Sequence, residues 1–328
     1  MDKFKIVYFG SPDFAADFLE KLITDTTINK LIEVKLVVTQ PDQKVGRKQI
    51  LTPTPVKLVA KKYLMSKDIK FFSLSGLGVP AVIKNLYIEL KDIDLVLVYA
   101  YGALIPKKIL SLPKYGFWNI HPSLLPKYRG PSPIATPLIN GDKTTGVTII
   151  KMDEEIDHGP IIAQETYTIK SSDYRPDLET KLTNLAFEMF KIIIKMGVEG
   201  LGIPTARSRG ILSEASTDGK RHETGPIFKL TEQNHKEATY TKKLEKSGGF
   251  ISFENLKLKI ENSPEKLFNL FRGLYPWPGI WTILPNGKRL KITKITMKQF
   301  NNLTIDAVQL EGKTEVDFKT FNKAYKIF

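Results

Sequence analysis

The sequence predicts an α/β protein: a doubly wound, mostly parallel sheet, followed by a small β-barrel. Three observations support this. In the first 200 residues, short apolar runs alternate with helix-like segments. One of these runs, Asp94–Tyr99, is almost entirely apolar, as expected of a strand buried on both faces of a parallel sheet. From about Gly197 the alternation stops, and short strand-like runs with turns take its place.

The alternation defines the elements of the first part in order. Strands are predicted at Lys5–Phe9, Val34–Val38, Ile69–Phe72, Asp94–Tyr99, Gly116–His121, Val147–Lys151 and Ile161–Thr168. Helices are predicted at Pro55–Tyr63, Pro80–Leu90, Pro106–Leu110, Pro133–Ile139 and Asp177–Met196. A further helix follows Gly10, with Ser11 as its N-cap and Pro12 at its first position. Such βαβ units build a Rossmann-like sheet that binds ligands beyond the carboxyl ends of its strands.

The remaining part of the chain has a different pattern. A polar segment rich in Pro, Gly, Ser and Thr comes first, and it is read as a linker with an exposed insertion. Short strands between Trp281 and Ile295 and at Leu303–Leu310, with a helix at Ser263–Leu274, predict an OB-like barrel. Trp277 and Trp281 are expected in the barrel core rather than as stacking residues for RNA bases. The predicted domains are a catalytic domain at 1–203, a linker at 204–236 and the OB-like domain at 237–328.

Composition narrows the class of protein. The chain has 328 residues, 42% of them hydrophobic, which is enough for two packed domains. It has no cysteine and four histidines, none of them in a metal-ligand spacing, so we expect neither disulfides nor a protein-bound metal. The N-terminus leads directly into a strand, and no apolar run approaches the ~18 residues that span a bilayer. We therefore expect a cytoplasmic monomer that does not bind membranes.

The charge distribution suggests a polyanionic partner. The net charge is +14, and residues 236–328 contain 17 Lys and Arg against 9 Asp and Glu. Nucleic acid is a suitable partner for such a domain, although a solvated basic surface explains the charge equally well. The segment Asp42–Gln49 forms a basic tip hinged at a glycine, with cations at Lys44, Arg47 and Lys48. It suits contacts to phosphates, or else is an ordinary solvated turn.

One stretch of sequence predicts chemistry directly. Asn119 and His121 stand two residues apart at the end of a predicted strand, so their side chains project from the same face. An amide can polarise a carbonyl oxygen, and an imidazole can move a proton near pH 7. Asp157, in an acidic loop that follows a later strand, is a candidate to orient His121 or to collect a proton. This combination favours acyl transfer.

The chain also resembles the methionyl-tRNA formyltransferase family over most of its length. The resemblance is carried by Ile6–Ala15, Val38–Asp42, Gly46–Lys48, Leu51–Lys57, Ala100–Gly102, Asn119–Gly130, Gly141–Thr148, Met152–Pro160, Ala238–Tyr240 and Arg272–Gly279. It does not extend to residues near 205–235. It implies 10-formyltetrahydrofolate as the donor and the α-amino group of methionyl initiator tRNA as the acceptor, giving N-formylmethionyl-tRNA for translation initiation.

The resemblance also assigns roles to residues. The family's catalytic residues fall on Asn119, His121 and Asp157, and its folate-contacting residues fall on Ser123, Leu124, Leu125 and Pro126. The family's tRNA-facing loop falls on Pro41–Pro55, with its key arginine at Arg47. Lys44 and Lys48 lie in the same loop and are expected to support the contact.

Three departures from the family pattern keep alternatives open. The family usually has a small residue at Pro122, Gly-Ala-Ala-Pro where this chain has Gly130–Pro133, and Thr at His158. Relatives that formylate other amines have His-Pro-Ser and Gly-Pro variants, so an N-formyltransferase acting on an amino-sugar nucleotide is the main alternative. A formyltetrahydrofolate hydrolase and a non-catalytic RNA-binding protein are further alternatives. The Arg47 loop and the Arg272–Gly279 motif resemble the tRNA enzyme, which disfavours the sugar-nucleotide enzyme and the hydrolase. The intact catalytic set disfavours a non-catalytic protein.

Overall fold

The chain forms two compact units, each assembled from segments that are distant in the sequence. In the computed structural model, residues 3–46, 48–67, 69–73, 80–198, 230–297 and 302–326 are described. The first unit comprises Met1–Arg129, Gly146–Tyr167 and Thr180–Thr239. The second comprises Gly130–Thr145, Thr168–Glu179 and Tyr240–Phe328. The long helix α7 (Arg175–Val198) contributes residues to both units, and the predicted domain boundaries at 203 and 236 stay predictions.

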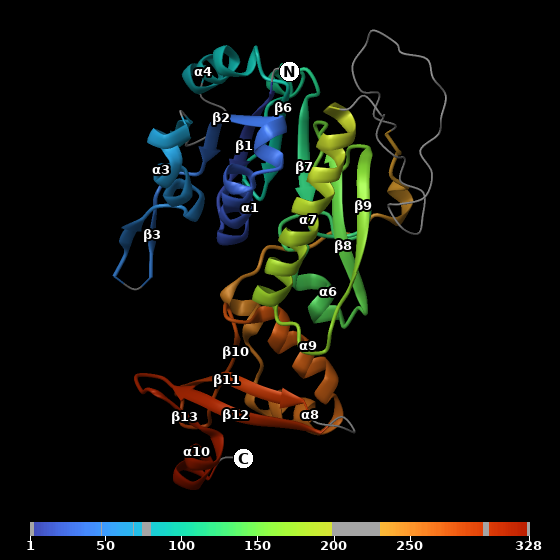
Figure 1. Cartoon of the computed structure of the whole chain (residues 1–328). Coiled ribbons are helices and arrows are strands. Elements are labelled where there is room, and N and C mark those ends of the chain that lie inside the picture. The colour runs from blue at the N-terminus through green and yellow to red at the C-terminus, as the bar shows by residue number, and fades with distance from the viewer. Residues whose placement is uncertain are drawn as a thin grey trace. The chain divides into compact units, whose positions relative to one another are not determined.

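The first unit is built on a seven-stranded sheet in the order β5-β2-β1-β6-β7-β8-β9 (Figure 1). The strands are β1 (Phe4–Gly10), β2 (Ile32–Thr39), β5 (Lys70–Ser73), β6 (Leu95–Tyr99), β7 (Phe117–His121), β8 (Thr144–Lys151) and β9 (Ile161–Thr168). The pairings from β5 to β7 are parallel, and β7 pairs with β8 antiparallel. The predicted doubly wound, mostly parallel sheet is therefore confirmed.

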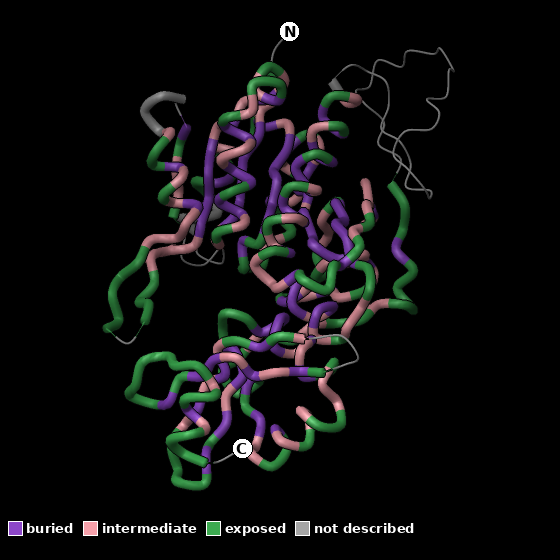
Figure 2. Tube along the Cα trace, turned by 60° about the horizontal axis from the view of Figure 1, so that its bottom comes forward, coloured by how far each residue is buried: buried purple, intermediate pink, exposed green. Residues whose placement is uncertain are grey.

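Each face of this sheet buries its own apolar core, which appears as the purple strands in Figure 2. On one face, Val7, Phe9 and Phe117 pack with residues of α4 (Pro80–Leu90) and α5 (Lys107–Leu110). On the other face, Tyr8 and Tyr99 pack with aromatic residues of α1 (Asp13–Thr24) and α7. Alternate residues of β1 thus face opposite helical layers, which explains why the strand reads as continuously apolar.

Successive strands are added on one side of β1 and then on the other. The chain passes from β1 to β2 and β5 on one side, and returns through β6 and β7 on the other. In open α/β sheets, ligands bind at such a switch point, here beyond the carboxyl ends of β1 and β6. The remaining helices of the first unit are α2 (Ile28–Leu31), α3 (Pro55–Lys67) and the 3₁₀ helix His235–Glu237.

The predicted start of the first helix is wrong by one residue. Pro12 itself occupies the N-cap position of α1, and Ser11 precedes it. The hydroxyl of Ser11 donates to the backbone oxygen of Tyr101 and accepts from the backbone N–H of Gln40. Ser11 therefore links three loops at the switch point instead of capping the helix.

The basic segment after β2 forms a small exposed hairpin. Its strands, β3 (Gln43–Val45) and β4 (Ile50–Thr52), pair antiparallel, and every residue of both strands is exposed. Lys44 and Lys48 are exposed there as well, whereas Arg47 lies outside the described residues. A hairpin this short, with no residue packed on a core, is held mainly by its own ladder.

The second unit contains a four-stranded antiparallel sheet in the order β10-β11-β12-β13. The bounds are β10 (Ile280–Ile283), β11 (Arg289–Met297), β12 (Leu303–Leu310), β13 (Glu315–Asp317), α6 (Ala135–Asn140), α8 (Phe253–Asn262), α9 (Pro264–Leu274), α10 (Phe318–Tyr325) and a 3₁₀ helix at Lys246–Gly249. Its core joins the sheet to α9 through Leu267, Phe271 and Val308, among others. This small antiparallel β domain bears out the expected barrel-type fold.

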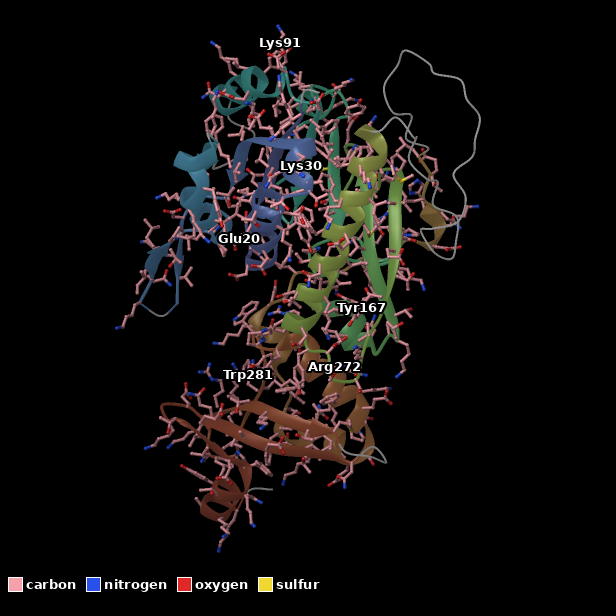
Figure 3. All side chains as sticks on the ribbon, in the orientation of Figure 1. Glu20, Lys30, Lys91, Tyr167, Arg272 and Trp281 are labelled. Atoms are coloured by element: carbon pink, nitrogen blue, oxygen red, sulfur yellow. The ribbon has the colours of Figure 1, made fainter. Side chains whose placement is uncertain are left out.

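Within the second unit, Arg272 is a structural residue. Its guanidinium is buried, donates to Oδ1 of Asn269 at 3.0 Å and to the backbone oxygen of Lys170 at 3.1 Å, and is labelled in Figure 3. Burial lowers the pKa of Arg272 from its ordinary value, while the nearby acidic groups oppose that shift. The placement of Trp277 in a barrel core is wrong, since its side chain is 53% exposed. Trp281 is partly buried against Phe250, with ring centroids 4.8 Å apart.

Candidate active site

The site begins at the carboxyl end of β7. Asn119 pairs with Val98 of β6 and with Ile150 of β8, so its position in the sheet is fixed from both sides. His121 follows two residues later on the same face of the strand, and its ring is almost fully buried. The predicted shared face of the amide and the imidazole is therefore present in the fold.

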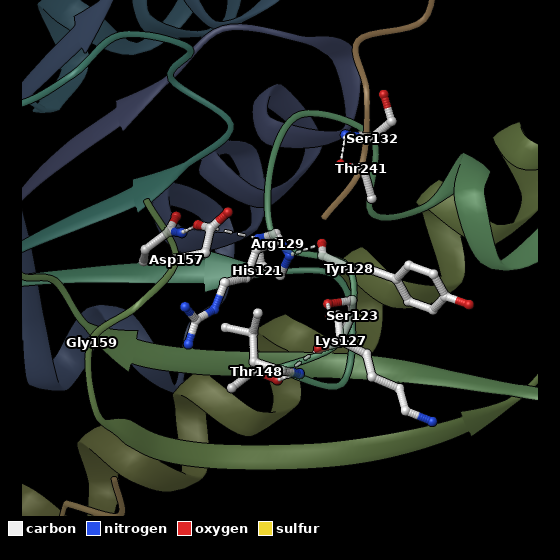
Figure 4. A network of polar contacts seen from close by, with 12 residues as sticks. His121, Ser123, Lys127, Tyr128, Arg129, Ser132, Thr148, Asp157, Gly159 and Thr241 are labelled. Atoms are coloured by element: carbon white, nitrogen blue, oxygen red, sulfur yellow. Dashed lines mark hydrogen bonds and ion pairs between the residues drawn. The ribbon is translucent and has the colours of Figure 1, made fainter. Parts of the chain in front are cut away.

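The third predicted residue, Asp157, reaches this pair from the loop that follows β8 (Figure 4). Nδ2 of Asn119 donates to Oδ1 of Asp157 at 3.0 Å. Nδ1 of His121 lies 3.4 Å from the same carboxylate oxygen. The three side chains that the sequence singled out separately thus meet at one oxygen atom.

The hydrogen bonds define the orientation of the His121 ring. Its Nε2 lies 2.9 Å from the backbone oxygen of Tyr128, and a carbonyl oxygen can only accept. Nε2 therefore carries a proton and donates it, and Nδ1 is the nitrogen that faces Asp157. A proton on Nδ1 completes a charge-assisted contact with the carboxylate, so this pair can exchange a proton.

The loop after His121 is held by its own polar groups. Ser123 is fully buried, and its hydroxyl donates to the backbone oxygen of Lys127 at 2.7 Å. Leu125 packs in a small cluster with Ile150 and Ile161. Of the four residues predicted to contact folate, Leu124 and Pro126 are the two whose side chains are partly open. Contact with folate stays a prediction for all four.

Four residues that border this site were not predicted. Arg129 is 2% exposed, and its guanidinium donates to Oε1 of Gln233 at 2.7 Å and to Nδ1 of His235 at 2.8 Å. Tyr128 supplies the acceptor for His121. The position of Arg129 at the end of the loop that follows the Asn-His motif is an available signal. Gln233 and His235 gave none, because they stand in polar sequence that reads as a linker.

Polar groups also gather at the switch point. The backbone oxygen of Tyr101 accepts from Ser11 and from Nε2 of Gln40. The hydroxyl of Tyr101 is buried and has no hydrogen-bond partner among the described residues. Burial raises the pKa of Tyr101 to about 12. The phenol is therefore neutral at physiological pH.

In the described part of the chain, no helix combines the length and the apolar character needed to cross a bilayer. No group of three or more His, Cys, Asp or Glu side chains there is arranged to hold a metal ion.

An amide, an imidazole and a carboxylate that meet near the end of a central strand combine a hydrogen-bond donor with groups that carry protons, which is the chemistry that group transfer requires. Comparison with known proteins identifies the group. Residues 4–193 match the formyl transferase family, and residues 250–304 match the formyl transferase C-terminal domain. The chain belongs to the formyl transferase family, and it is a folate-dependent one-carbon transferase.

The curated relatives of this chain share the name of one activity within the family. The methionyl-tRNA formyltransferase of Caldicellulosiruptor saccharolyticus is 34% identical, covering 98% of this chain and 97% of the relative. The methionyl-tRNA formyltransferase of Kosmotoga olearia is 38% identical over 85% of this chain and 76% of the relative. The Staphylococcus aureus protein of the same name is 33% identical over 91% of this chain and 81% of the relative. All three extend through both units.

Solved structures support the fold. A 4-N formyltransferase from Francisella tularensis matches 88% of this chain and 96% of that chain, with a TM-score of 0.60 and 19% identity. A Helicobacter canadensis N-formyltransferase, solved with folinic acid and dTDP-3-aminofucose, matches 90% of each chain with a TM-score of 0.57 and 18% identity. At this level of identity the likeness concerns the fold alone.

Proposed function

We propose that this protein transfers the formyl group of 10-formyltetrahydrofolate to the α-amino group of methionyl initiator tRNA. The observation that carries the proposal is the convergence of Asn119 and His121 on one oxygen of Asp157. The product, N-formylmethionyl-tRNA, serves translation initiation. Relatives named for this activity match nearly the whole chain, which supports the choice of acceptor.

In the proposed mechanism, Asn119 stabilises the negative charge that develops on the formyl oxygen. An α-amino group has a pKa near 8, so a usable fraction is neutral at pH 7 and attacks the formyl carbon without a protein nucleophile. The amide of Asn119 has two N–H groups, and one of them is occupied by Asp157. The other can donate to the oxyanion, an interaction whose loss typically costs about 3 kcal/mol in the barrier.

The pair of His121 and Asp157 handles the proton. The attacking amine must lose a proton, and the departing folate nitrogen must gain one. The carboxylate is the more accessible partner, since the side chain of Asp157 is 11% exposed against 5% for His121. We assign Asp157 to collect the proton from the amine and Nδ1 of His121 to share it, because Nε2 is committed to Tyr128. The same pair then returns the proton to the departing folate nitrogen.

Apolar side chains in the loops that follow β6, β7 and β8 suit the bicyclic donor. Leu124 is partly exposed, and two strongly exposed apolar residues, Leu104 and Ile156, stand in the loops that follow β6 and β8. Such side chains gain by covering a flat aromatic ring system and by excluding water that would hydrolyse the formyl donor. Ile156 directly precedes Asp157, so one loop supplies both an apolar side chain to cover the donor and the carboxylate that handles the proton.

Two surfaces support a tRNA acceptor, each within its own unit. The β3–β4 hairpin in the first unit presents the exposed cations Lys44 and Lys48, with Arg47 at its tip in the sequence. In the second unit, Trp277 and Tyr240 are exposed, at 53% and 70%. Cations contact phosphates, and exposed aromatic rings stack on unpaired bases.

One observation favours a second candidate, an amino-sugar nucleotide as acceptor. Pro122 stands directly after His121, where relatives acting on other amines also have proline. The curated relatives named for tRNA formylation are 33–38% identical to this chain, which favours the tRNA acceptor.

The decisive experiment is transfer of radiolabelled formyl from 10-formyltetrahydrofolate, with charged initiator tRNA, elongator methionyl-tRNA and amino-sugar nucleotides as parallel acceptors. We expect formylation of the initiator tRNA and little transfer to the others. Transfer to sugar nucleotides alone would contradict the proposal. Because charged tRNA is the acceptor, we also propose that the protein acts in the cytoplasm. We further propose that it is a monomer, which light scattering of the purified protein tests.

A further inference from the structure

The segment Leu230–Thr239, here called the return segment, runs along the first unit beside the candidate active site. It starts next to β9. The backbone N–H of Thr231 donates to the oxygen of Ile161 at 2.9 Å, and the N–H of Ile161 donates to the oxygen of Thr231 at 2.8 Å. This reciprocal pair fixes the return segment to the strand that follows the loop of Asp157.

The other end of the return segment is fixed to the loop that follows His121. The backbone oxygen of Thr239 accepts from the N–H of Arg129 at 2.8 Å, and its hydroxyl accepts from the N–H of Tyr128 at 2.9 Å. The N–H of Thr239 donates to the oxygen of Pro126 at 3.2 Å. The return segment thus connects the loop that follows His121 to the strand that follows the loop of Asp157.

Between these ends, one buried side chain bonds to both loops. Nε2 of Gln233 donates to the backbone oxygen of Asp157 at 2.9 Å and to that of Gly159 at 2.7 Å. Its Oε1 accepts from the guanidinium of Arg129 at 2.7 Å. Both donors and an acceptor lone pair of the amide are used, and Gln233 is 5% exposed. No other uncharged side chain of similar length could make all three bonds.

Gln233 contacts Asp157 at a point where the backbone conformation is unfavourable for a residue other than glycine. Asp157 has a φ of +51°, in the left-handed region that residues other than glycine seldom adopt. Two residues on, a side chain at Gly159 would clash with the carbonyl oxygen of Lys151. The direction of the Asp157 carboxylate depends on this unusual backbone conformation, which its surroundings must maintain.

A second contact joins the same loop to the return segment. The rings of His158 and His235 stack in parallel, with centroids 4.0 Å apart and planes within 6°. Nδ1 of His158 lies 2.6 Å from Oδ2 of Asp153, and Nδ1 of His235 accepts from Arg129. His158 is one of the positions at which the chain departs from the family pattern, and its partner comes from the return segment.

We propose that Gln233 is a positioning residue for Asp157, and that the return segment supports the catalytic site through this one buried side chain. The inference rests on the proposed formyl transfer. Gln233 acts through the backbone of Asp157, and holds the carboxylate within reach of Asn119 and His121. A misplacement of ~1 Å at such a site typically lowers the rate about 100-fold.

Two substitutions separate the functions of the Gln233 amide. Gln233→Met has similar size and makes none of the three bonds, whereas Gln233→Glu keeps the acceptor for Arg129 and loses both donors. We expect each to lower kcat at least tenfold, with the KM values for folate and tRNA within twofold of the unmodified protein. Glu232→Gln, at an exposed neighbour, is the matched control and should leave kcat unchanged. Full kcat in both Gln233 variants would overturn the proposal.

A double-mutant cycle distinguishes positioning from general damage to the fold. In single-turnover measurements, Gln233→Met should lower the rate in the unmodified protein but not further in an Asp157→Asn background, because its effect passes through that carboxylate. Equal losses in both backgrounds would refute the positioning role.

Hydrogen–deuterium exchange tests the same inference without any turnover. Gln233→Met should raise the exchange rate of amides in residues 152–160 by about tenfold or more, while the amides of β6 and β7 stay protected. Unchanged exchange in 152–160 would overturn the inference. Because no formyl acceptor is present, this result is independent of whether the proposed function is correct.

Discussion

Nδ2 of Asn119 donates to Oδ1 of Asp157 at 3.0 Å, so the amide and the carboxylate hold each other in place. The two residues are 38 positions apart in the sequence. Their contact ties the end of β7 to the loop after β8. Each side chain then needs little reorganisation to act, which is how preorganised polar groups lower a reaction barrier.

Replacing Asn119 by alanine should lower kcat by about 100- to 1,000-fold, because an oxyanion donor is lost. His121→Ala should also lower turnover. Binding of methionyl-tRNA, measured by filter binding, should persist in both variants. Asn234→Ala, which removes an exposed amide in the return segment, is the control. Unchanged turnover in Asn119→Ala would remove this residue from the mechanism.

Arg47→Ala should weaken the use of tRNA more than the binding of folate. Each lost phosphate contact reduces the salt dependence of binding, so the negative slope of log K against log salt should become shallower by about one unit. Lys44→Ala should act in the same direction. Lys30→Ala, at an exposed lysine of α2, serves as the charge-matched control. Equal loss of folate and tRNA use in Arg47→Ala would indicate a misfolded loop instead.

Trp277→Ala tests the exposed aromatic surface of the second unit. The expected result is about a 5- to 150-fold increase in the KM for tRNA, corresponding to about 1–3 kcal/mol for one base stacked on an aromatic ring. The thermal midpoint should hardly change, since the side chain is 53% exposed. Ile283→Ala, another exposed apolar side chain of this unit, should leave KM unchanged. An unchanged KM in Trp277→Ala would exclude stacking there.

Arg272→Met should destabilise the second unit by about 3 kcal/mol, because it leaves the buried acceptors of the guanidinium without their donor. Arg289→Met provides the contrast. Arg289 makes only a 4.0 Å surface ion pair with Glu311, worth less than about 1 kcal/mol. Differential scanning calorimetry of both variants measures the difference. Similar unfolding midpoints would show that Arg272 is not a structural residue.

Tyr101→Phe should leave stability at pH 8 unchanged or raise it by about 1 kcal/mol, because the buried hydroxyl has no partner among the described residues. The folded-state pKa of Tyr101, about 12, lies above the ordinary value of 10. The folded protein therefore retains this proton more tightly, and the resulting stability is lost as pH rises from 10 toward 12. Urea unfolding at pH 9 and pH 11 should show a smaller loss in Tyr101→Phe. An equal loss would mean that other groups govern the alkaline limb.

Elements with strong local signals were predicted well. The strand at Asp94–Tyr99 and the helix at Pro80–Leu90 follow directly from apolar patterning, and the structure contains both. The hairpin β3–β4 was read only as a basic tip, because exposed strands of three residues have no apolar alternation. The cap of α1 was misplaced by one residue, because the hydroxyl of Ser11 bonds to Tyr101, which lies 90 residues away.

The sequence by itself determined the doubly wound fold and the types of residue that can carry the chemistry. Periodicity and local residue order encode these properties, so Asn119 and His121 could be placed on one face of a strand. Only the tertiary structure decided that Asp157 reaches both of them, and that Gln233 holds its backbone. Contacts between residues 38 and 76 positions apart depend on how loops close over the sheet, which no local pattern in a single chain records.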